Sequence, residues 1–199
     1  MKFQTPVLLI GFNRPEKLKS ILNIISQVNP ENLFVCIDGP RTDNLNDHAK
    51  NKQITELLNE YDYLIKSKKI RTNNLGCKLG VSDAINWFFE FNEFGIILED
   101  DCLPNITFFS YCEELLNKYK DNMKIMHISG HKKIMGNFNS KESYYFSRIA
   151  NIWGWATWRN RWELYDIRME NLELNRKVVM DNFKMPKHGK YWYRLFKHI

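Results

Sequence analysis

Hydrophobic residues in the first half of the chain alternate between two patterns. Short, continuously apolar runs cover residues 6–12, 33–37 and 95–98, as expected of strands buried on both faces of a parallel sheet. Between these runs, apolar residues recur at the spacing of a helix. The three helical stripes are Leu18, Ile21, Leu22, Ile25 and Val28; Ile54, Leu57, Leu58 and Tyr61; and Val81, Ala84, Ile85, Phe88 and Phe89. Alternating strands and helices predict an open, mostly parallel α/β sheet flanked by helices.

Local signals refine this prediction. After the first strand, Asn13 offers an N-cap and Pro15 a first-turn residue. A third short strand is expected around Lys69 to Arg71, and a further helix is expected to open at Pro104 and Asn105. Two later strands are predicted for "IMHIS" (125–129) and "YYFSR" (144–148).

Composition narrows the class of protein. The 199 residues suit one domain, and no apolar run approaches the roughly 20 residues that span a bilayer. The N-terminus lacks the small residues of a signal-peptide cleavage site.

Four cysteines without a CxxC pair argue against zinc and disulfides and fit a reducing cytosol. The net charge of +6 favours acidic partners, or serves only solubility.

Three consecutive carboxylates, Glu99 to Asp101, follow the apolar run at 95–98. In an open α/β sheet, ligands bind beyond the carboxyl ends of the strands, so residues 13–14, 38–41 and 71–74 are expected at the same edge. Carboxylates beside a few bases suit a hard divalent cation, Mn²⁺ or Mg²⁺, with a diphosphate. A solvated acidic turn is the alternative for such a run.

The ordered set of motifs resembles the GT-A fold of nucleotide-sugar glycosyltransferases. The resemblance rests on "LLIGFNRPEKLKSILN", "CIDG" and above all "IILEDDCLPNITFF", which is similar to the acidic DXD-type motif. It is strongest to bacterial family 2 enzymes akin to the N-acetylglucosaminyltransferase I type, whose acceptor-side segment resembles "NIWGWATWRNRW". The resemblance implies one Rossmann-like GT-A domain over residues 1–199, with a nucleotide-sugar-binding half at 1–105 and an acceptor-side half at 106–199.

The same resemblance implies roles for individual residues. Asp101 would be the metal ligand, while Asp100 and Glu99 would contact ribose or sugar hydroxyls. The other implied nucleotide-sugar contacts are Phe12, Asn13 and Arg14 in the first turn, Asp38 at the base, and Arg71 or Lys78 near the diphosphate. From the residues alone, Asp38 with Gly39 is equally compatible with a plain turn, and Arg14 with a salt bridge at a helix start.

Aromatic residues crowd the later part of the chain. The resemblance implies that Trp153, Gly154 and Trp155 lie on the acceptor side. Because flat rings pack against the apolar faces of pyranoses, Trp153, Trp155, Trp158 and Trp162 could line a sugar-binding surface. Trp155, Trp158 and Trp162 also fall at helical spacing, which favours packing in the core.

An inverting enzyme of this kind needs a carboxylate general base near the acceptor. The later candidates are Glu163, Asp166, Glu170, Glu173 and Asp181, none of them in a matching motif. Three explanations stay open: the catalytic domain is incomplete, the base has an unusual position such as Asp166, or the protein binds donor without efficient transfer.

These observations predict a metal-dependent inverting glycosyltransferase, of the hexosyl or N-acetylhexosaminyl type. It would take a nucleoside-diphosphate sugar and act on a glycan or lipid-linked glycan in bacterial surface polysaccharide synthesis. The expected location is the cytoplasm, with peripheral contact at the inner membrane face through C-terminal basic and aromatic residues. Alternatives are a silent sugar-nucleotide or carbohydrate-binding protein, or a nucleotidyltransferase. No nucleic-acid partner is expected, because carboxylates at the crevice repel phosphates.

Overall fold

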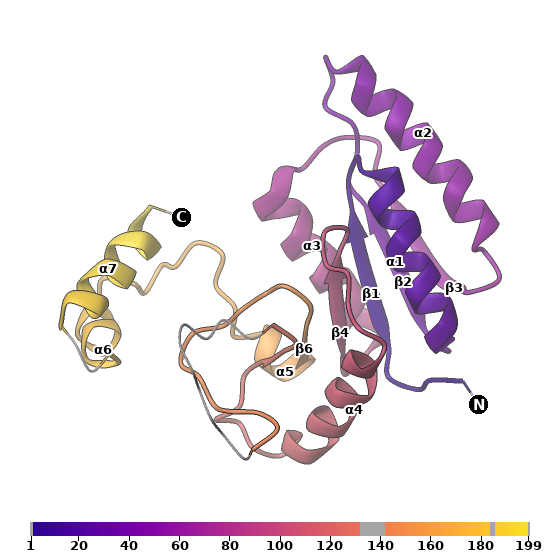
Figure 1. The fold of residues 1–199 in the computed structure, drawn as a ribbon. Coiled ribbons are helices and arrows are strands. Elements are labelled where there is room, and N and C mark those ends of the chain that lie inside the picture. Colours follow the sequence, from indigo (N-terminus) through magenta and orange to yellow (C-terminus); the bar gives the residue numbers. More distant parts are fainter. Residues whose placement is uncertain (1, 132–141, 184–185, 199) are drawn as a thin grey trace. The chain divides into compact units, whose positions relative to one another are not determined.

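The chain divides into two compact units in the computed structural model, which describes residues 2–131, 142–183 and 186–198 (Figure 1). The larger unit comprises Met1–Lys141 with Ala150–Glu163, and the smaller comprises Glu142–Ile149 with Leu164–Ile199. The larger unit therefore contains all the predicted nucleotide-contacting turns, whereas Asp166 belongs to the smaller one.

A six-stranded sheet with the order β3-β2-β1-β4-β6-β5 forms the centre of the larger unit. Strands β1 to β4 are parallel, and β6 runs antiparallel to both β4 and β5. The strands are β1 Val7–Gly11, β2 Leu33–Ile37, β3 Ile65–Ile70, β4 Phe94–Glu99, β5 Ile128–Ser129 and β6 Trp155–Trp158. This topology confirms the predicted open, mostly parallel α/β sheet.

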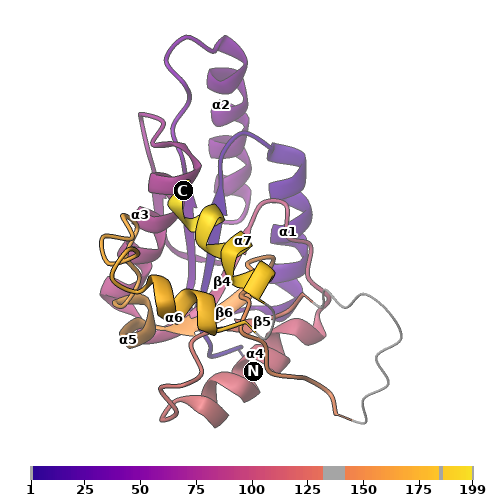
Figure 2. The ribbon, with the colours of Figure 1, turned by 90° about the vertical axis from the view of Figure 1, so that its left-hand side faces the viewer.

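Helices cover both faces of the sheet. They are α1 Pro15–Val28, α2 Leu45–Glu60, α3 Gly76–Phe91, α4 Thr107–Tyr119 and α5 Arg159–Trp162. Leu8 and Ile10 of β1 join Phe88 of α3 in one buried cluster, whereas a Cβ on Gly11 would lie 3.2 Å from Leu18 of α1. Successive strand residues point to opposite faces, and Figure 2 accordingly shows α3 and α1 on opposite sides of the strands. All five residues of β1 are therefore buried.

One prediction for the later chain is wrong and another is confirmed. Residues 144–148, predicted as a strand, form none, and the next strand along the chain is β6. Trp155 and Trp158 are buried, as their predicted packing in the core requires, but they lie in β6 rather than on a helix. β6 pairs with β4 at Ile97↔Trp155 and Phe94↔Trp158. Such pairing between distant segments overrides local periodicity.

Two further details correct the sequence prediction. Arg14, not Asn13, occupies the N-cap position of α1, and no side chain caps this helix. Pro15 does lie in the first turn, as expected. β3 also begins four residues before the predicted Lys69. Its lysines at positions 66 and 68 are exposed, and charged side chains of this kind protect an edge strand from pairing with other chains.

The smaller unit contains α6 Arg176–Asp181 and α7 Pro186–Lys197. The two helices approach closely at Gly189, where a Cβ would lie 2.4 Å from the backbone oxygen of Met180. Among the described residues, no helix combines the length and the apolar composition that crossing a bilayer requires.

Candidate functional site

The loops that follow β1 and β4 meet where the strand order reverses, with β2 on one side of β1 and β4 on the other. Ligands of open α/β sheets bind at such a point. The backbone N–H of Phe12 donates to Oδ2 of Asp100 at 3.3 Å. Arg14 forms an ion pair with Asp100 and a longer one, 3.5 Å, with Asp101. The structure therefore brings together the predicted residues of the first turn and the acidic motif.

The three carboxylates differ in exposure. Burial raises the pKa of both Glu99 and Asp100; neighbouring carboxylates raise it further, and Arg14 opposes the shift. The side chain of Asp100 is only 3% exposed, while that of Asp101 is 35% exposed. Burial lowers the pKa of Arg14, but Asp100 and Asp101 outweigh this and raise it. Asp101 is thus the accessible carboxylate of a site that favours added positive charge.

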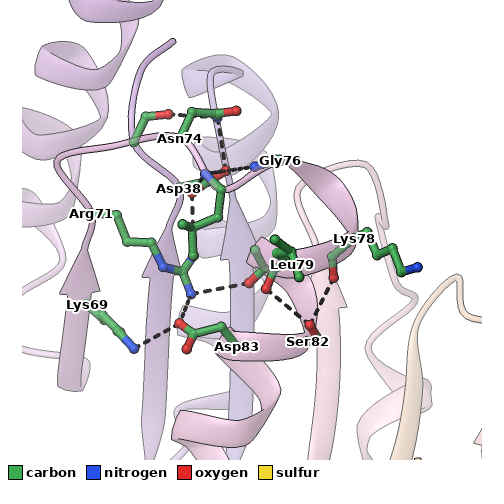
Figure 3. A network of polar contacts seen from close by, with 12 residues as sticks. Asp38, Lys69, Arg71, Asn74, Gly76, Lys78, Leu79, Ser82 and Asp83 are labelled. Carbon is green, nitrogen blue, oxygen red and sulfur yellow. Dashed lines mark hydrogen bonds and ion pairs between the residues drawn. The ribbon is translucent and has the colours of Figure 1, made fainter. Parts of the chain in front are cut away.

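Asp38 holds the start of α3 in place (Figure 3). Its carboxylate accepts hydrogen bonds from the backbone N–H groups of Leu75 at 3.1 Å and Gly76 at 3.1 Å, and from Nδ2 of Asn74 at 3.0 Å. A carboxylate at the amino end of a helix satisfies N–H groups that have no partner within the helix and interacts favourably with the helix dipole. Base recognition by Asp38 stays a prediction, and any base would share this carboxylate with the fold.

Arg71 lies under the same loop, with its side chain 8% exposed. Its Nη2 donates to Asp83 at 2.5 Å and to the carbonyl of Gly80 at 3.2 Å, and its Nη1 lies 3.6 Å from Asp38. Burial raises the pKa of Asp83, but Lys69 and Arg71 outweigh it and hold that pKa below its ordinary value. Arg71 therefore links the end of β3 to α3 from inside the loop.

Lys78, the other predicted diphosphate contact, lies in the first turn of α3 and is exposed. Figure 3 shows its side chain pointing away from Arg71. The two basic residues thus occupy different surroundings, and a role for either at a diphosphate stays a prediction.

A second polar cluster beside the first turn was missed by the sequence prediction. Asp47 of α2 accepts from Nδ2 of Asn13 at 2.7 Å and from Nε of Arg41 at 2.5 Å. The guanidinium of Arg41 also lies 5.6 Å from the ring centroid of Phe12. Hydrogen bonding from Arg41 is the main cause that holds the pKa of Asp47 well below its ordinary value. The sequence signal was the Asn44-x-x-Asp47 spacing of a helix start, where Asn44 caps the N–H of Asp47.

The predicted acceptor-side residues lie next to the acidic motif through β6. Because β6 runs antiparallel to β4 with Trp155 opposite Ile97, the chain before Trp155 runs toward the carboxyl end of β4. Gly154 adopts φ +70°, and its Cβ position lies 3.5 Å from Leu98. Trp155 is buried in the core, whereas Trp153 is 62% exposed. Trp153 is therefore the accessible indole of this segment.

Asp166, the candidate base, forms a local turn in the smaller unit. Its carboxylate accepts from the backbone N–H groups of Arg168 at 2.9 Å and Glu170 at 2.7 Å. These contacts explain its conformation without any ligand, so its assignment as a base stays a prediction.

No group of three or more His, Cys, Asp or Glu side chains in the described parts of the chain is arranged to hold a metal ion. A complete protein cage for a cation is therefore not present there. Mg²⁺ and Mn²⁺ bound with nucleotide diphosphates usually take only one or two carboxylates, because the phosphates and water supply the other ligands. The partly exposed carboxylate of Asp101 fits that requirement.

A cavity of about 530 Å³ lies at the opposite end of β4, lined in part by Phe94, Trp158 and Arg161. Arg161 donates from Nη2 to the carbonyls of Tyr119 and Lys120 at the end of α4. An arginine in this position satisfies the last carbonyls of the helix. Helix capping thus explains the position of Arg161 in the cavity wall, and the cavity lies away from Glu99, Asp100 and Asp101.

The chain has a Rossmann-like open α/β fold, as the order of its parallel strands, with β2 and β4 on opposite sides of β1, shows. No protein-family model matches it, and no curated protein matches it. Among solved structures, it is similar to 4-diphosphocytidyl-2C-methyl-D-erythritol synthase, with 10% identity, a TM-score of 0.40, and coverage of 88% of this chain and 85% of that chain. A likeness at this level does not decide the function, which has to be argued from the residues of the site.

Proposed function

We propose that the protein is a metal-dependent inverting glycosyltransferase that moves a sugar from a nucleoside-diphosphate sugar to a glycan or lipid-linked glycan in the cytoplasm. The observation that carries this proposal is the meeting of Arg14 with Asp100 and Asp101 at the point where the strand order reverses. Asp101 is an accessible carboxylate that can bind a metal ion, and the guanidinium of Arg14 beside it can bind phosphate. The pair therefore suits a ligand that carries both a metal ion and phosphates.

Each residue has a distinct task under this proposal. Asp101 would hold Mn²⁺ or Mg²⁺, and the bound ion would offset the charge that develops on the leaving nucleoside diphosphate. Asp100 is buried and fixed by Arg14 and by the N–H of Phe12, so it would position the first turn against the ribose. Glu99 would accept from sugar hydroxyls. Trp153 is exposed on the segment that leads into β6 and would pack against an acceptor sugar.

Calorimetric titration of UDP, GDP and CDP, each with and without Mn²⁺, tests the donor site. We expect one nucleotide to bind in a metal-dependent way, and Asp101→Asn to abolish that binding. Asp121→Asn is the matched control, because it makes the same chemical change on an exposed carboxylate at the opposite cavity. Equal binding by wild type and Asp101→Asn, or no binding of any nucleotide by the folded wild type, would contradict the proposal.

A silent sugar-nucleotide-binding protein is the second candidate, favoured by the local hydrogen bonds that already occupy Asp166. Transfer assays with the nucleotide sugar that binds separate the two functions. Transfer that survives in Asp181→Asn but is lost in Asp166→Asn would identify Asp166 as the base. Metal-dependent binding without transfer or donor hydrolysis would support the silent function.

A further inference from the structure

Positive charge is concentrated on helix α7 of the smaller unit. The helix carries Lys187, Lys190, Arg194 and Lys197 and contains no Asp or Glu. It therefore contributes +4, while the whole chain has a formal net charge of +6. Steps of three, four and three residues place these side chains along one side of a helix.

Most of this charge has no carboxylate partner. Among the described residues of the smaller unit, ion pairs join Arg168 to Glu170 and Lys197 to Glu173. Lys187, Lys190 and Arg194 are exposed, and no carboxylate of the described chain pairs with them. The three charges are thus available to an external anionic surface.

An apolar row lies next to the basic one. Tyr191 and Leu195 follow Lys187 at intervals of four residues, and they are 61% and 39% exposed. Residues four apart are neighbours on a helix surface. The helix therefore presents apolar side chains directly beside its basic side chains.

A different side of α7 provides its packing. Gly189 meets the backbone of Met180, the ring of Trp192 stacks on Phe183 with centroids 6.1 Å apart, and Tyr193 is 9% exposed. The packing of α7 in the smaller unit therefore does not use Tyr191 and Leu195, which lie on its exposed side.

We propose that α7 binds the surface of a membrane that contains anionic lipids. Basic residues near such a surface are attracted to lipid headgroups, and adjacent aromatic and aliphatic side chains enter the boundary between headgroups and acyl chains. A nucleic acid fits this helix less well, because only Tyr191 of the exposed apolar row offers a ring for stacking on a base, whereas Leu195 is aliphatic. The inference goes beyond the proposed function, because lipid binding by α7 requires neither donor nor metal.

Co-sedimentation with vesicles tests the proposal. The chain is expected to bind vesicles of equal parts phosphatidylglycerol and phosphatidylcholine and not vesicles of phosphatidylcholine alone. Each basic residue lost near an anionic surface should lower partitioning about fivefold, so Lys187→Gln with Lys190→Gln and Arg194→Gln should lower it roughly hundredfold. Tyr191→Ser with Leu195→Ser should also weaken binding without removing any charge.

A matched variant controls for net charge. Lys17→Gln with Lys19→Gln and Lys66→Gln removes the same charge from exposed positions of the larger unit and should leave vesicle binding within about twofold. Circular dichroism checks that every variant is folded. Asp101→Asn should bind vesicles like the wild type, so failure of the donor site and failure of this inference are told apart.

Several outcomes would overturn the inference. If the triple variant of α7 and the triple variant of the larger unit lost vesicle binding equally, net charge alone would explain the binding. Unchanged binding in the folded α7 variant would place the lipid contact elsewhere. Absence of vesicle binding by the wild type, or binding to a single-stranded oligonucleotide at lower concentration than to the vesicles, would also contradict it.

Discussion

Arg14, which follows β1, forms an ion pair with Asp100, which follows β4, across the point where the strand order reverses. The side chain of Asp100 is 3% exposed, whereas that of Arg14 is 41% exposed. Loss of Arg14 would leave a buried carboxylate without its cation, and an unpaired buried charge costs more than the pair itself contributes.

Arg14→Gln should lower the free energy of unfolding by about 1–3 kcal/mol. Adding Asp100→Asn should restore part of this loss, because the buried group is then neutral. Urea unfolding of both single variants and the double variant gives the coupling energy. Arg168→Gln is the control, since its pair with Glu170 is exposed and should contribute less than about 0.5 kcal/mol. Additive effects at Arg14 and Asp100 would refute the coupling.

Asp38→Ala should destabilise the larger unit by about 2–4 kcal/mol, because it removes the acceptor for the first N–H groups of α3 and the carboxylate beside the buried Arg71. Asp38→Asn should have an intermediate effect. Asp101→Asn should change stability by less than about 0.5 kcal/mol. Thermal unfolding compares the three variants, and equal stabilities of Asp38→Ala and wild type would show that the network does not hold this loop.

Gly39→Ala and Gly76→Ala should both destabilise the larger unit, but for different reasons. A Cβ on Gly39 would lie 2.4 Å from the backbone carbon of Asn73, so the loops after β2 and β3 must separate, at a cost of about 3 kcal/mol. A Cβ on Gly76 has open space, but φ there is +75°, which costs about 1–2 kcal/mol in a residue other than glycine. Chemical denaturation measures both losses, and a larger loss at Gly76 would contradict the steric account.

Stability of the larger unit should fall in mildly acidic solution because of His127. Burial lowers the pKa of His127, whose Nε2–H donates to the carbonyl of Asn151 at 2.8 Å and whose ring lies 4.8 Å from that of Trp155. The unfolded chain thus binds a proton near pH 6.5 and the folded chain only at lower pH. The free energy of unfolding is therefore at its full value above about pH 6.5, where His127 is neutral in both states. It decreases as the pH falls toward the pKa of His127 in the folded chain.

The midpoint of thermal unfolding should fall between neutral pH and about pH 5 in the wild type. In His127→Gln it should fall by less over the same range. His198→Gln is a suitable control, because His198 is exposed in the smaller unit. A wild-type slope that persists in His127→Gln would assign the titration to another group.

The parallel part of the fold could be predicted because each element carries its own local pattern. The buried runs of β1, β2 and β4 and the stripes of α1 and α3 need no distant partner to be recognised. β6 could not be identified in this way, because its tryptophans imitate a helical stripe and only the pairing with β4 makes it a strand.

The candidate site was predictable to a similar degree. The carboxyl ends of parallel strands share one edge, so Arg14 and Asp101 were expected to lie near each other. The partners of Asp47 depend on how α2 turns toward the first loop, which no local spacing reveals. The burial of Arg71 likewise follows from its contact with Asp83 on a later helix.

The loop between β3 and α3 combines two kinds of position. Arg71 and Asn74 hold the frame through Asp38, whereas Thr72 and Asn73 between them have exposed side chains. Substitutions at Thr72 and Asn73 can accumulate without disturbing that frame. A combinatorial library confined to these two codons should therefore vary the surface of this loop while the scaffold beneath it is retained.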